Sequence, residues 1–158
     1  MSDPNPIDPK QEVTEILEAA SRRPRPPGAL YAGCVTPAEA HRLHELGTAR
    51  LVDVRTEEER DYVGHVPGSL HVVWRPRGAT EPNARFVEDL AGVARRDETI
   101  LLLCRSAHRS KLAGNAAAQA GFTAVYDVLE GFEGDLDANG HRGTVGGWRF
   151  RGLPWTQG

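Results

Sequence analysis

Residues Thr99 to Gly121 read TILLLCRSAHRSKLAGNAAAQAG, and this segment indicates the architecture of the chain. Its apolar part, Ile100 to Leu103, predicts a strand that is buried on both faces of a parallel sheet. The Ala-rich part that follows predicts a helix, with Gly121 as the residue that ends it. In an open α/β sheet, ligands bind at the loop between such a strand and its helix. The candidate site therefore lies at Cys104 and the residues directly after it.

The loop after this strand begins with Cys104, the candidate nucleophile. It continues with Arg105, Ser106, Ala107, His108 and Arg109. Backbone N–H groups of a loop that turns into a helix can hold an anion, and the two arginines and a protonated histidine add positive charge. A thiol in this setting is expected to lose its proton more readily than free cysteine and to become nucleophilic. The competing interpretation, a small buried core residue, suits Cys34 better, because Cys34 has no cationic loop near it in the sequence.

Length and composition limit the classes of protein. The chain has 158 residues, a formal net charge of −3 and two cysteines. These values indicate one domain with an appendage, and neither a disulfide framework nor a zinc site. The mild charge favours neither nucleic acid nor a membrane surface as a partner. The segment from Met1 to Pro6 shows no signal-peptide pattern, and no run is long enough to span a bilayer, so we expect a cytoplasmic protein.

Residues 1–27 form a predicted N-terminal extension to a domain at 28–158. Asp8 and Pro9 have the pattern of a helix start, and apolar residues at helical spacing follow them. This short amphipathic helix needs a surface to pack on, and the domain itself is the expected one. The Arg- and Pro-rich segment 21–28 ends the helix as a stiff linker. Such a short run of charge is more often solvated than a nucleic-acid arm.

Strands and helices alternate along the rest of the chain. Besides the central strand, the sequence predicts strands at 30–35, 50–54, 69–73 and 124–129. Helix starts are predicted at Thr36 and Thr56, each followed by a Glu three residues later, and at Asn83. This alternation predicts an α/β fold with a mostly parallel central sheet of about four or five strands and helices on both faces. Residues 130–158 predict an irregular, Gly-rich tail folded over the domain.

Polar residues are also expected around the loop. Asp53 and Arg55 lie near the carboxyl end of a predicted strand, on the ligand side of the sheet. They either hold the loop in shape from behind or form an ordinary ion pair with Glu58 or Glu59, and the sequence favours neither. A long loop of turn-forming residues, which could form a wall of the pocket, carries two further arginines, Arg75 and Arg77.

Three sets of motifs resemble the rhodanese family. They are LVDVR at 51–55 with GHVPG at 64–68, CRSAHR at 104–109, and VLEG at 128–131 with Trp148 and GLP at 152–154. Their order and spacing are similar to those of a single-domain rhodanese from about residue 28 to 155. The resemblance implies a rhodanese-like three-layer domain with Cys104 as its catalytic residue. Loops of this family often carry Gly where this chain has Ala107, and a positive φ would strain an alanine there.

The leading hypothesis is therefore a sulfurtransferase that needs no metal and no organic cofactor. The Cys104 thiolate takes the outer sulfur of thiosulfate or a persulfide, residues 105–109 bind the anionic donor, and cyanide, a small thiol or a protein cysteine accepts the sulfur. A cysteine phosphatase or arsenate reductase uses a related loop, but its pattern has one more residue between Cys and Arg than the four found here. The remaining alternative is a catalytically silent rhodanese-like module used for binding or regulation.

Overall fold

The computed structural model describes residues 8–158, so the first residues, where the sequence shows no signal-peptide pattern, lie outside the described part. Its centre is a five-stranded parallel sheet in the order β1-β5-β4-β2-β3. The strands are β1 (Gly33–Val35), β2 (Arg50–Asp53), β3 (Leu70–His71), β4 (Thr99–Leu103) and β5 (Ala124–Val128). The predicted α/β architecture is confirmed, and β4, the strand expected at the centre, lies between β5 and β2.

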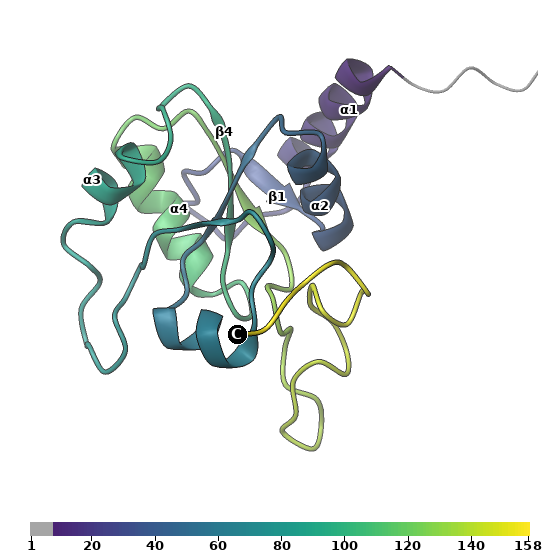
Figure 1. Ribbon diagram of the computed structural model, residues 1–158. Coiled ribbons are helices and arrows are strands. Elements are labelled where there is room, and N and C mark those ends of the chain that lie inside the picture. Colours follow the sequence, from purple (N-terminus) through teal and green to yellow (C-terminus); the bar gives the residue numbers. More distant parts are fainter. Residues whose placement is uncertain (1–7) are drawn as a thin grey trace, which may run out of the picture.

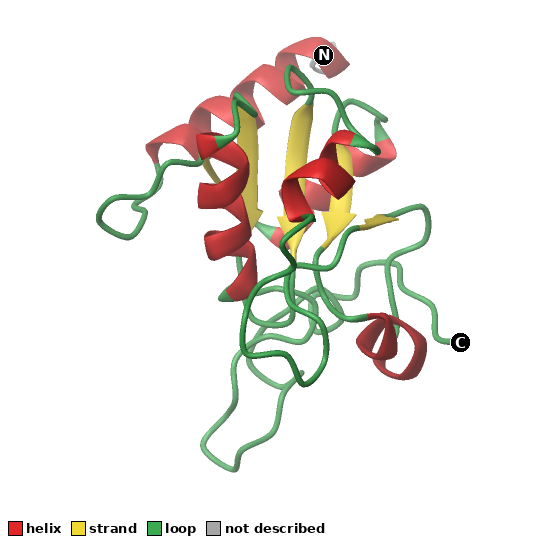
Figure 2. Ribbon diagram, turned by 90° about the vertical axis from the view of Figure 1, so that its left-hand side faces the viewer, coloured by secondary structure: helices red, strands yellow, loops and turns green. Residues whose placement is uncertain are grey.

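Helices cover both faces of this sheet (Figure 1). Two of them, α1 (Pro9–Arg22) and α2 (Pro37–Glu45), lie on one face, and α3 (Phe86–Ala91) and α4 (Arg109–Gln119) lie on the other. A short π-helix, η1 (Glu59–Val63), follows β2. The strands point toward one end of the molecule, where the long loops gather (Figure 2). The carboxyl ends of the strands and their loops therefore share one surface.

Helix caps explain where several of these helices begin. The Asp8 side chain accepts a hydrogen bond from Lys10 N (3.0 Å) at the start of α1, and Thr36 forms the predicted capping box at the start of α2. The prediction that Asn83 caps a helix is wrong, because Arg85 occupies the N-cap of α3. The Asn83 side chain accepts from Arg85 N instead, in a turn that precedes the helix.

The apolar core has two layers, one on each face of the sheet, and side chains of β4 contribute to both. Residues 100–103 are fully buried and alternate between a layer under α3 and α4 and a layer under α1 and α2. Helix α1 packs on the second layer, where Ala20 is fully buried. Gly33 of β1 permits this approach, because a Cβ atom there would collide with the Ala20 carbonyl group. The extension is thus in contact with the core of the domain.

The edges of the fold differ from the predicted boundaries. β1 begins at Gly33 rather than at Leu30, which is 53% exposed, and β3 has two residues where a strand over 69–73 was predicted. The tail over 130–158 is irregular, yet Trp148 within it is fully buried. An antiparallel bridge between His65 and Thr156 ties the end of the tail to the segment after η1. No helix of the described part has the length and apolar character that crossing a bilayer requires.

Candidate active site

The loop at the carboxyl end of β4 has the local structure that the sequence predicts. Cys104 directly follows β4, and α4 begins at Arg109. Within the described chain, the backbone N–H groups of residues 105–110 donate no hydrogen bond to a protein acceptor. Backbone N–H groups are normally paired, and a series of unpaired ones at a helix N-terminus suits an anion. The loop therefore offers several backbone donors beside the cysteine.

The sulfur of Cys104 lies inside the protein, in a chain of polar contacts. The residue is 1% exposed. Its Sγ donates a hydrogen bond to Ser110 Oγ (3.3 Å), which donates to Asp127 Oδ1 (2.5 Å). Lys111 Nζ donates to Asp127 Oδ2 (2.9 Å) and to Ala107 O (2.7 Å). Sequence reasoning did not include Ser110, Lys111 or Asp127 in the site, although a carboxylate inside an apolar strand was a usable signal.

Asp127 of β5 binds a proton more tightly than an ordinary aspartate. Burial raises the pKa of its carboxyl group, because the side chain is 1% exposed and the charged form loses hydration. The Lys111 ammonium group and the Ser110 hydroxyl group act in the opposite direction and offset part of that rise. This carboxyl group is connected to the cysteine through the Ser110 hydroxyl group.

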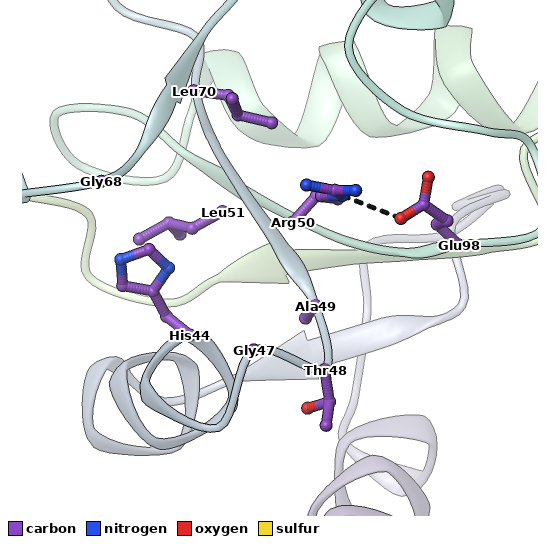
Figure 3. A pocket seen from close by; sticks show the side chains of 9 residues that line it. All are labelled: His44, Gly47, Thr48, Ala49, Arg50, Leu51, Gly68, Leu70 and Glu98. Atoms are coloured by element: carbon purple, nitrogen blue, oxygen red, sulfur yellow. Dashed lines mark hydrogen bonds and ion pairs between the residues drawn. The ribbon is translucent and has the colours of Figure 1, made fainter.

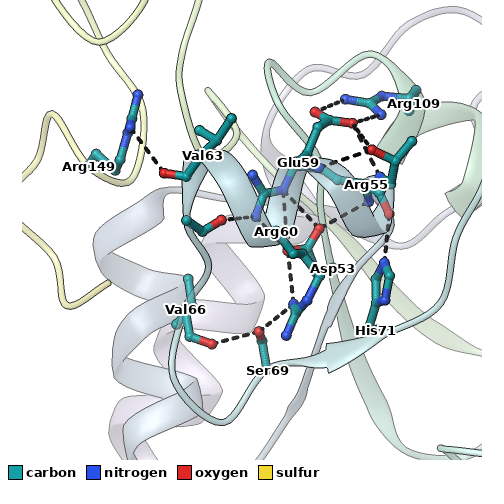
Figure 4. Close-up of polar contacts among 12 residues, drawn as sticks. Asp53, Arg55, Glu59, Arg60, Val63, Val66, Ser69, His71, Arg109 and Arg149 are labelled. Carbon is teal, nitrogen blue, oxygen red and sulfur yellow. Dashed lines mark hydrogen bonds and ion pairs between the residues drawn. The ribbon is translucent and has the colours of Figure 1, made fainter. Parts of the chain in front are cut away.

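Arg109 forms an ion pair that the sequence did not predict. Its guanidinium group binds both carboxylate oxygens of Glu59, the first residue of η1, at 2.6 and 2.8 Å (Figure 4). Burial alone would raise the pKa of Glu59, but the Arg109 hydrogen bond and charge, with the Thr56 N–H group, outweigh it and lower that pKa to about 2. The Glu59 carboxylate therefore offsets the positive charge that Arg109 is expected to add to the loop. Arg105 and His108 of the loop are exposed.

Asp53 and Arg55 form a buried ion pair, which Figure 4 shows together with Glu59 and Arg109. Both side chains are fully buried, and Arg55 Nη2 lies 2.8 Å from Asp53 Oδ2. Arg55 Nη2 also donates to Gly64 O at 2.7 Å. The alternative in which this pair binds Glu58 or Glu59 is therefore not the arrangement found.

The first residues of the tail support the loop from behind. The Arg55 guanidinium group lies 4.3 Å from the ring centre of Phe132, and Phe132 N donates to Cys104 O at 2.8 Å. Gly131 precedes it with φ of 71°, and a Cβ atom there would lie 2.5 Å from the carbonyl carbon of Arg105. Only a glycine fits this close approach without displacing the loop. Asp53 and Arg55 thus reach the loop indirectly, through Phe132.

Ala107 has the backbone conformation that would strain an alanine. Its φ is 69°, in the left-handed region. The residue is 5% exposed, so its methyl group is buried. The hydrogen bond from Lys111 Nζ holds its carbonyl group in place. The loop therefore keeps its shape in spite of a residue type that disfavours it.

One hollow of the surface lies apart from this loop. Figure 3 shows this hollow, lined by His44 and Gly68, with the Arg50–Glu98 ion pair (2.8 Å) beside them. Because β2 and β4 are parallel and Arg50 begins β2, this hollow lies at the amino ends of the strands, opposite Cys104. It does not belong to the candidate active site.

The two arginines of the long loop are exposed. Arg77 lines a hollow with Thr56, Glu57 and Glu58, and the lining of that hollow does not include residues 105–109. Within residues 8–158, no group of three or more His, Cys, Asp and Glu side chains is arranged to hold a metal ion.

Comparison with known proteins shows the family to which this chain is similar. A family model described as the rhodanese-like domain matches residues 36–138. An uncharacterized protein of Rickettsia prowazekii is 33% identical over 111 residues, which cover 68% of this chain and 82% of that protein. A protein of Arabidopsis thaliana named thiosulfate sulfurtransferase 16, chloroplastic, is 36% identical over 93 residues, which cover 56% of this chain and 77% of that protein.

A solved structure is also similar to this chain. The crystal structure of Rv0390 from M. tuberculosis is similar to this chain with a TM-score of 0.73 and 42% sequence identity. The similarity covers 81% of this chain and 99% of that one. The fold, the order of the motifs and these similarities lead to one conclusion: the chain belongs to the family of rhodanese-like domains.

Proposed function

We propose that this rhodanese-like chain is a sulfurtransferase that carries sulfur as a persulfide on Cys104. One observation carries the proposal: the cysteine ends the central strand, and the N–H groups of residues 105–110 beside it have no acceptor in the described chain. Such a set of donors suits the negative charge of a sulfane donor and of a persulfide. The thiosulfate sulfurtransferase among the relatives adds support by similarity.

In the first step, the Cys104 thiolate attacks the outer sulfur of thiosulfate. A sulfur–sulfur bond forms to Cys104 Sγ, the bond to the sulfonate sulfur breaks, and sulfite leaves with the electron pair. The enzyme is left with a Cys104 persulfide anion. Backbone N–H groups of Arg105, Ser106 and Ala107 stabilise this anion, and the exposed Arg105 and His108 side chains attract the anionic donor.

In the second step, a nucleophile removes the outer sulfur and the thiolate is restored. Cyanide, a small thiol or a protein cysteine has the required affinity for sulfane sulfur. Because one product leaves before the second substrate reacts, ping-pong kinetics are expected. Arg109 acts in this scheme mainly by holding the start of α4 through its ion pair with Glu59.

Intact-mass spectrometry tests the proposal directly. The protein is incubated with thiosulfate, and we expect a gain of one sulfur atom that disappears when cyanide is added. The variant Cys104→Ser should show no gain, whereas Cys34→Ala should gain the sulfur as the unmodified chain does. An aryl phosphate assay is run beside it, and phosphatase turnover without sulfur transfer would contradict the proposal.

A further inference from the structure

Sulfur transfer requires Cys104 to lose its thiol proton, and the side chains of Ser110 and Asp127 lie behind the cysteine. Cys104 and Asp127 are each 1% exposed, and Ser110 between them is fully buried. The hydrogen bonds all run in one direction: Cys104 Sγ donates to Ser110 Oγ (3.3 Å), and Ser110 Oγ donates to Asp127 Oδ1 (2.5 Å). A thiol, a hydroxyl group and a carboxylate are therefore already aligned for transfer of a proton.

We propose that Asp127 receives, through the Ser110 hydroxyl group, the proton that Cys104 loses when it becomes a nucleophile. The proposal rests on the sulfurtransferase function proposed above. The thiol proton moves to Ser110 Oγ while the hydroxyl proton of Ser110 moves to Asp127 Oδ1. The products are a thiolate and a neutral carboxylic acid, and the Ser110 hydroxyl group then donates to the sulfur. No proton and no electron leaves the site.

Burial makes this transfer preferable to release of the proton into water. Creating a new charge inside a protein costs hydration energy, whereas the transfer only moves one negative charge from the carboxylate to the sulfur. Burial raises the pKa of Asp127, so this carboxylate accepts a proton from a thiol more readily than an ordinary aspartate does. Lys111 stays beside Asp127 Oδ2 at 2.9 Å. Its ammonium group acts against the rise in the pKa of Asp127 and favours the charged carboxylate, the form that can accept the proton.

The other titratable groups near Asp127 do not replace it as the acceptor. Tyr31 and Cys34 face it from the side of β1, and burial raises the pKa of the Tyr31 phenol to about 12 and the pKa of the Cys34 thiol above its usual value. Both therefore hold their own protons at neutral pH. His108 and Lys111 approach from α4 and the loop before it, and they contribute positive charge. Asp127 is the carboxylate that accepts the hydrogen bond from Ser110 Oγ, so it is the acceptor at the end of the path.

The test compares pH profiles of Cys104 reactivity in three variants. Asp127→Asn can still accept the hydrogen bond from Ser110 but cannot accept the proton in this pH range, and Ser110→Ala interrupts the path while keeping the Asp127–Lys111 pair. Asp97→Asn is the matched control, because Asp97 is exposed at the opposite end of β4, with 77% of its side chain accessible. Persulfide formation from thiosulfate is measured as kcat/KM at each pH, with thermal melting as the check on folding.

We expect both site variants to be slower than the control by about a hundredfold at neutral pH, the range of general acid–base effects. The deficit should close as the pH rises above about 8.5, the ordinary pKa of a cysteine, because hydroxide then removes the proton. A deficit of equal size at every pH would assign Asp127 a structural role only and overturn the proposal, as would no deficit at all. If Asp127→Asn fails to fold, the Ser110→Ala profile decides in the same way.

Alkylation separates this proposal from the proposed function. Iodoacetamide reports the thiolate of Cys104 without any sulfur donor, and the site variants should show alkylation profiles shifted to higher pH relative to Asp97→Asn. If the shift is present and thiosulfate yields no persulfide, the sulfurtransferase function fails and the proton path stands. If persulfide forms and the profiles coincide, the proton path fails and the function stands.

Discussion

The two cysteines of this chain have the same burial and very different surroundings. Cys34 and Cys104 are each 1% exposed and belong to the same apolar layer. Within the described residues, Cys34 Sγ makes no hydrogen bond, and burial raises its pKa, so it remains a protonated core thiol. Cys104 Sγ donates a hydrogen bond to Ser110 Oγ. The residues that follow Cys104, 105–110, have backbone N–H groups without an acceptor in the described chain. Burial alone thus does not distinguish a structural cysteine from a reactive one, whereas the polar neighbours do.

The largest expected effect comes from replacing each cysteine in turn. Cys104→Ser should abolish transfer of sulfur from thiosulfate to cyanide, because the persulfide cannot form. Cys34→Ala should keep the rate per folded molecule within about twofold and lower the free energy of unfolding by about 1 kcal/mol, the usual cost of a small change in a packed core. Steady-state thiocyanate production and chemical denaturation measure the two quantities. Equal loss of activity in both variants would remove the distinction drawn above.

A substitution at Gly131 would disturb the support of the Cys104 loop and leave both cysteines intact. Gly131→Ala should lower kcat/KM by about a hundredfold, because the new Cβ atom would lie 2.5 Å from Arg105 and push the loop out of position. Gly140→Ala is the matched control: Gly140 has φ of 77° and no atom within 4 Å of such a Cβ. Both variants carry strain from the positive φ, so the difference between their rates isolates the contact. Similar rates for the two would show that the loop does not depend on the tail.

A third prediction concerns the ion pair at the start of α4, for which Cys34 has no counterpart. The pKa of Glu59 is lowered to about 2 in the folded protein from 4.5, which corresponds to at most about 3 kcal/mol of stability at neutral pH. Because the folded pKa is the lower one, this contribution is complete above pH 4.5 and is lost as the pH falls toward 2.

Glu59→Gln should therefore lower the melting temperature at pH 7 and flatten its fall in acid. Glu98→Gln, which breaks the more exposed pair with Arg50, serves as the control and should have a smaller effect. Parallel melting curves for Glu59→Gln and the unmodified chain between pH 3 and 7 would contradict the assignment.

The smallest expected effect comes from relieving the strain at Ala107. Ala107→Gly removes an unfavourable φ of 69°, a gain of about 1 kcal/mol or more. It also removes a buried methyl group, which costs about 0.8 kcal/mol, and increases the freedom of the unfolded chain by a similar amount. These contributions nearly cancel, so the melting temperature should change by less than about 4 °C. A larger rise would mean that strain dominates at this loop.

The parts that the sequence predicts well are those that neighbouring residues determine. The apolar run before Cys104, the Ala-rich helix after it and the capping box at Thr36 all depend on short-range patterns, and all three are found in the structure. The contact between Arg109 and Glu59 joins residues far apart in the sequence, and so does the one between Ser110 and Asp127. Such pairings depend on the order of the strands, which no local pattern specifies. The missed part of the site is therefore its long-range part.

The buried tryptophan of the tail has a consequence for where the folding unit ends. The family model stops at residue 138, yet Trp148, the largest fully buried side chain, lies beyond it. Its indole N–H group donates a hydrogen bond to Pro154 O at 2.8 Å. This bond holds the segment around Pro154 against the buried tryptophan. A shortened version cut at the limit of family similarity would open a cavity the size of an indole ring. A fusion partner is therefore better attached before α1 than in place of the tail.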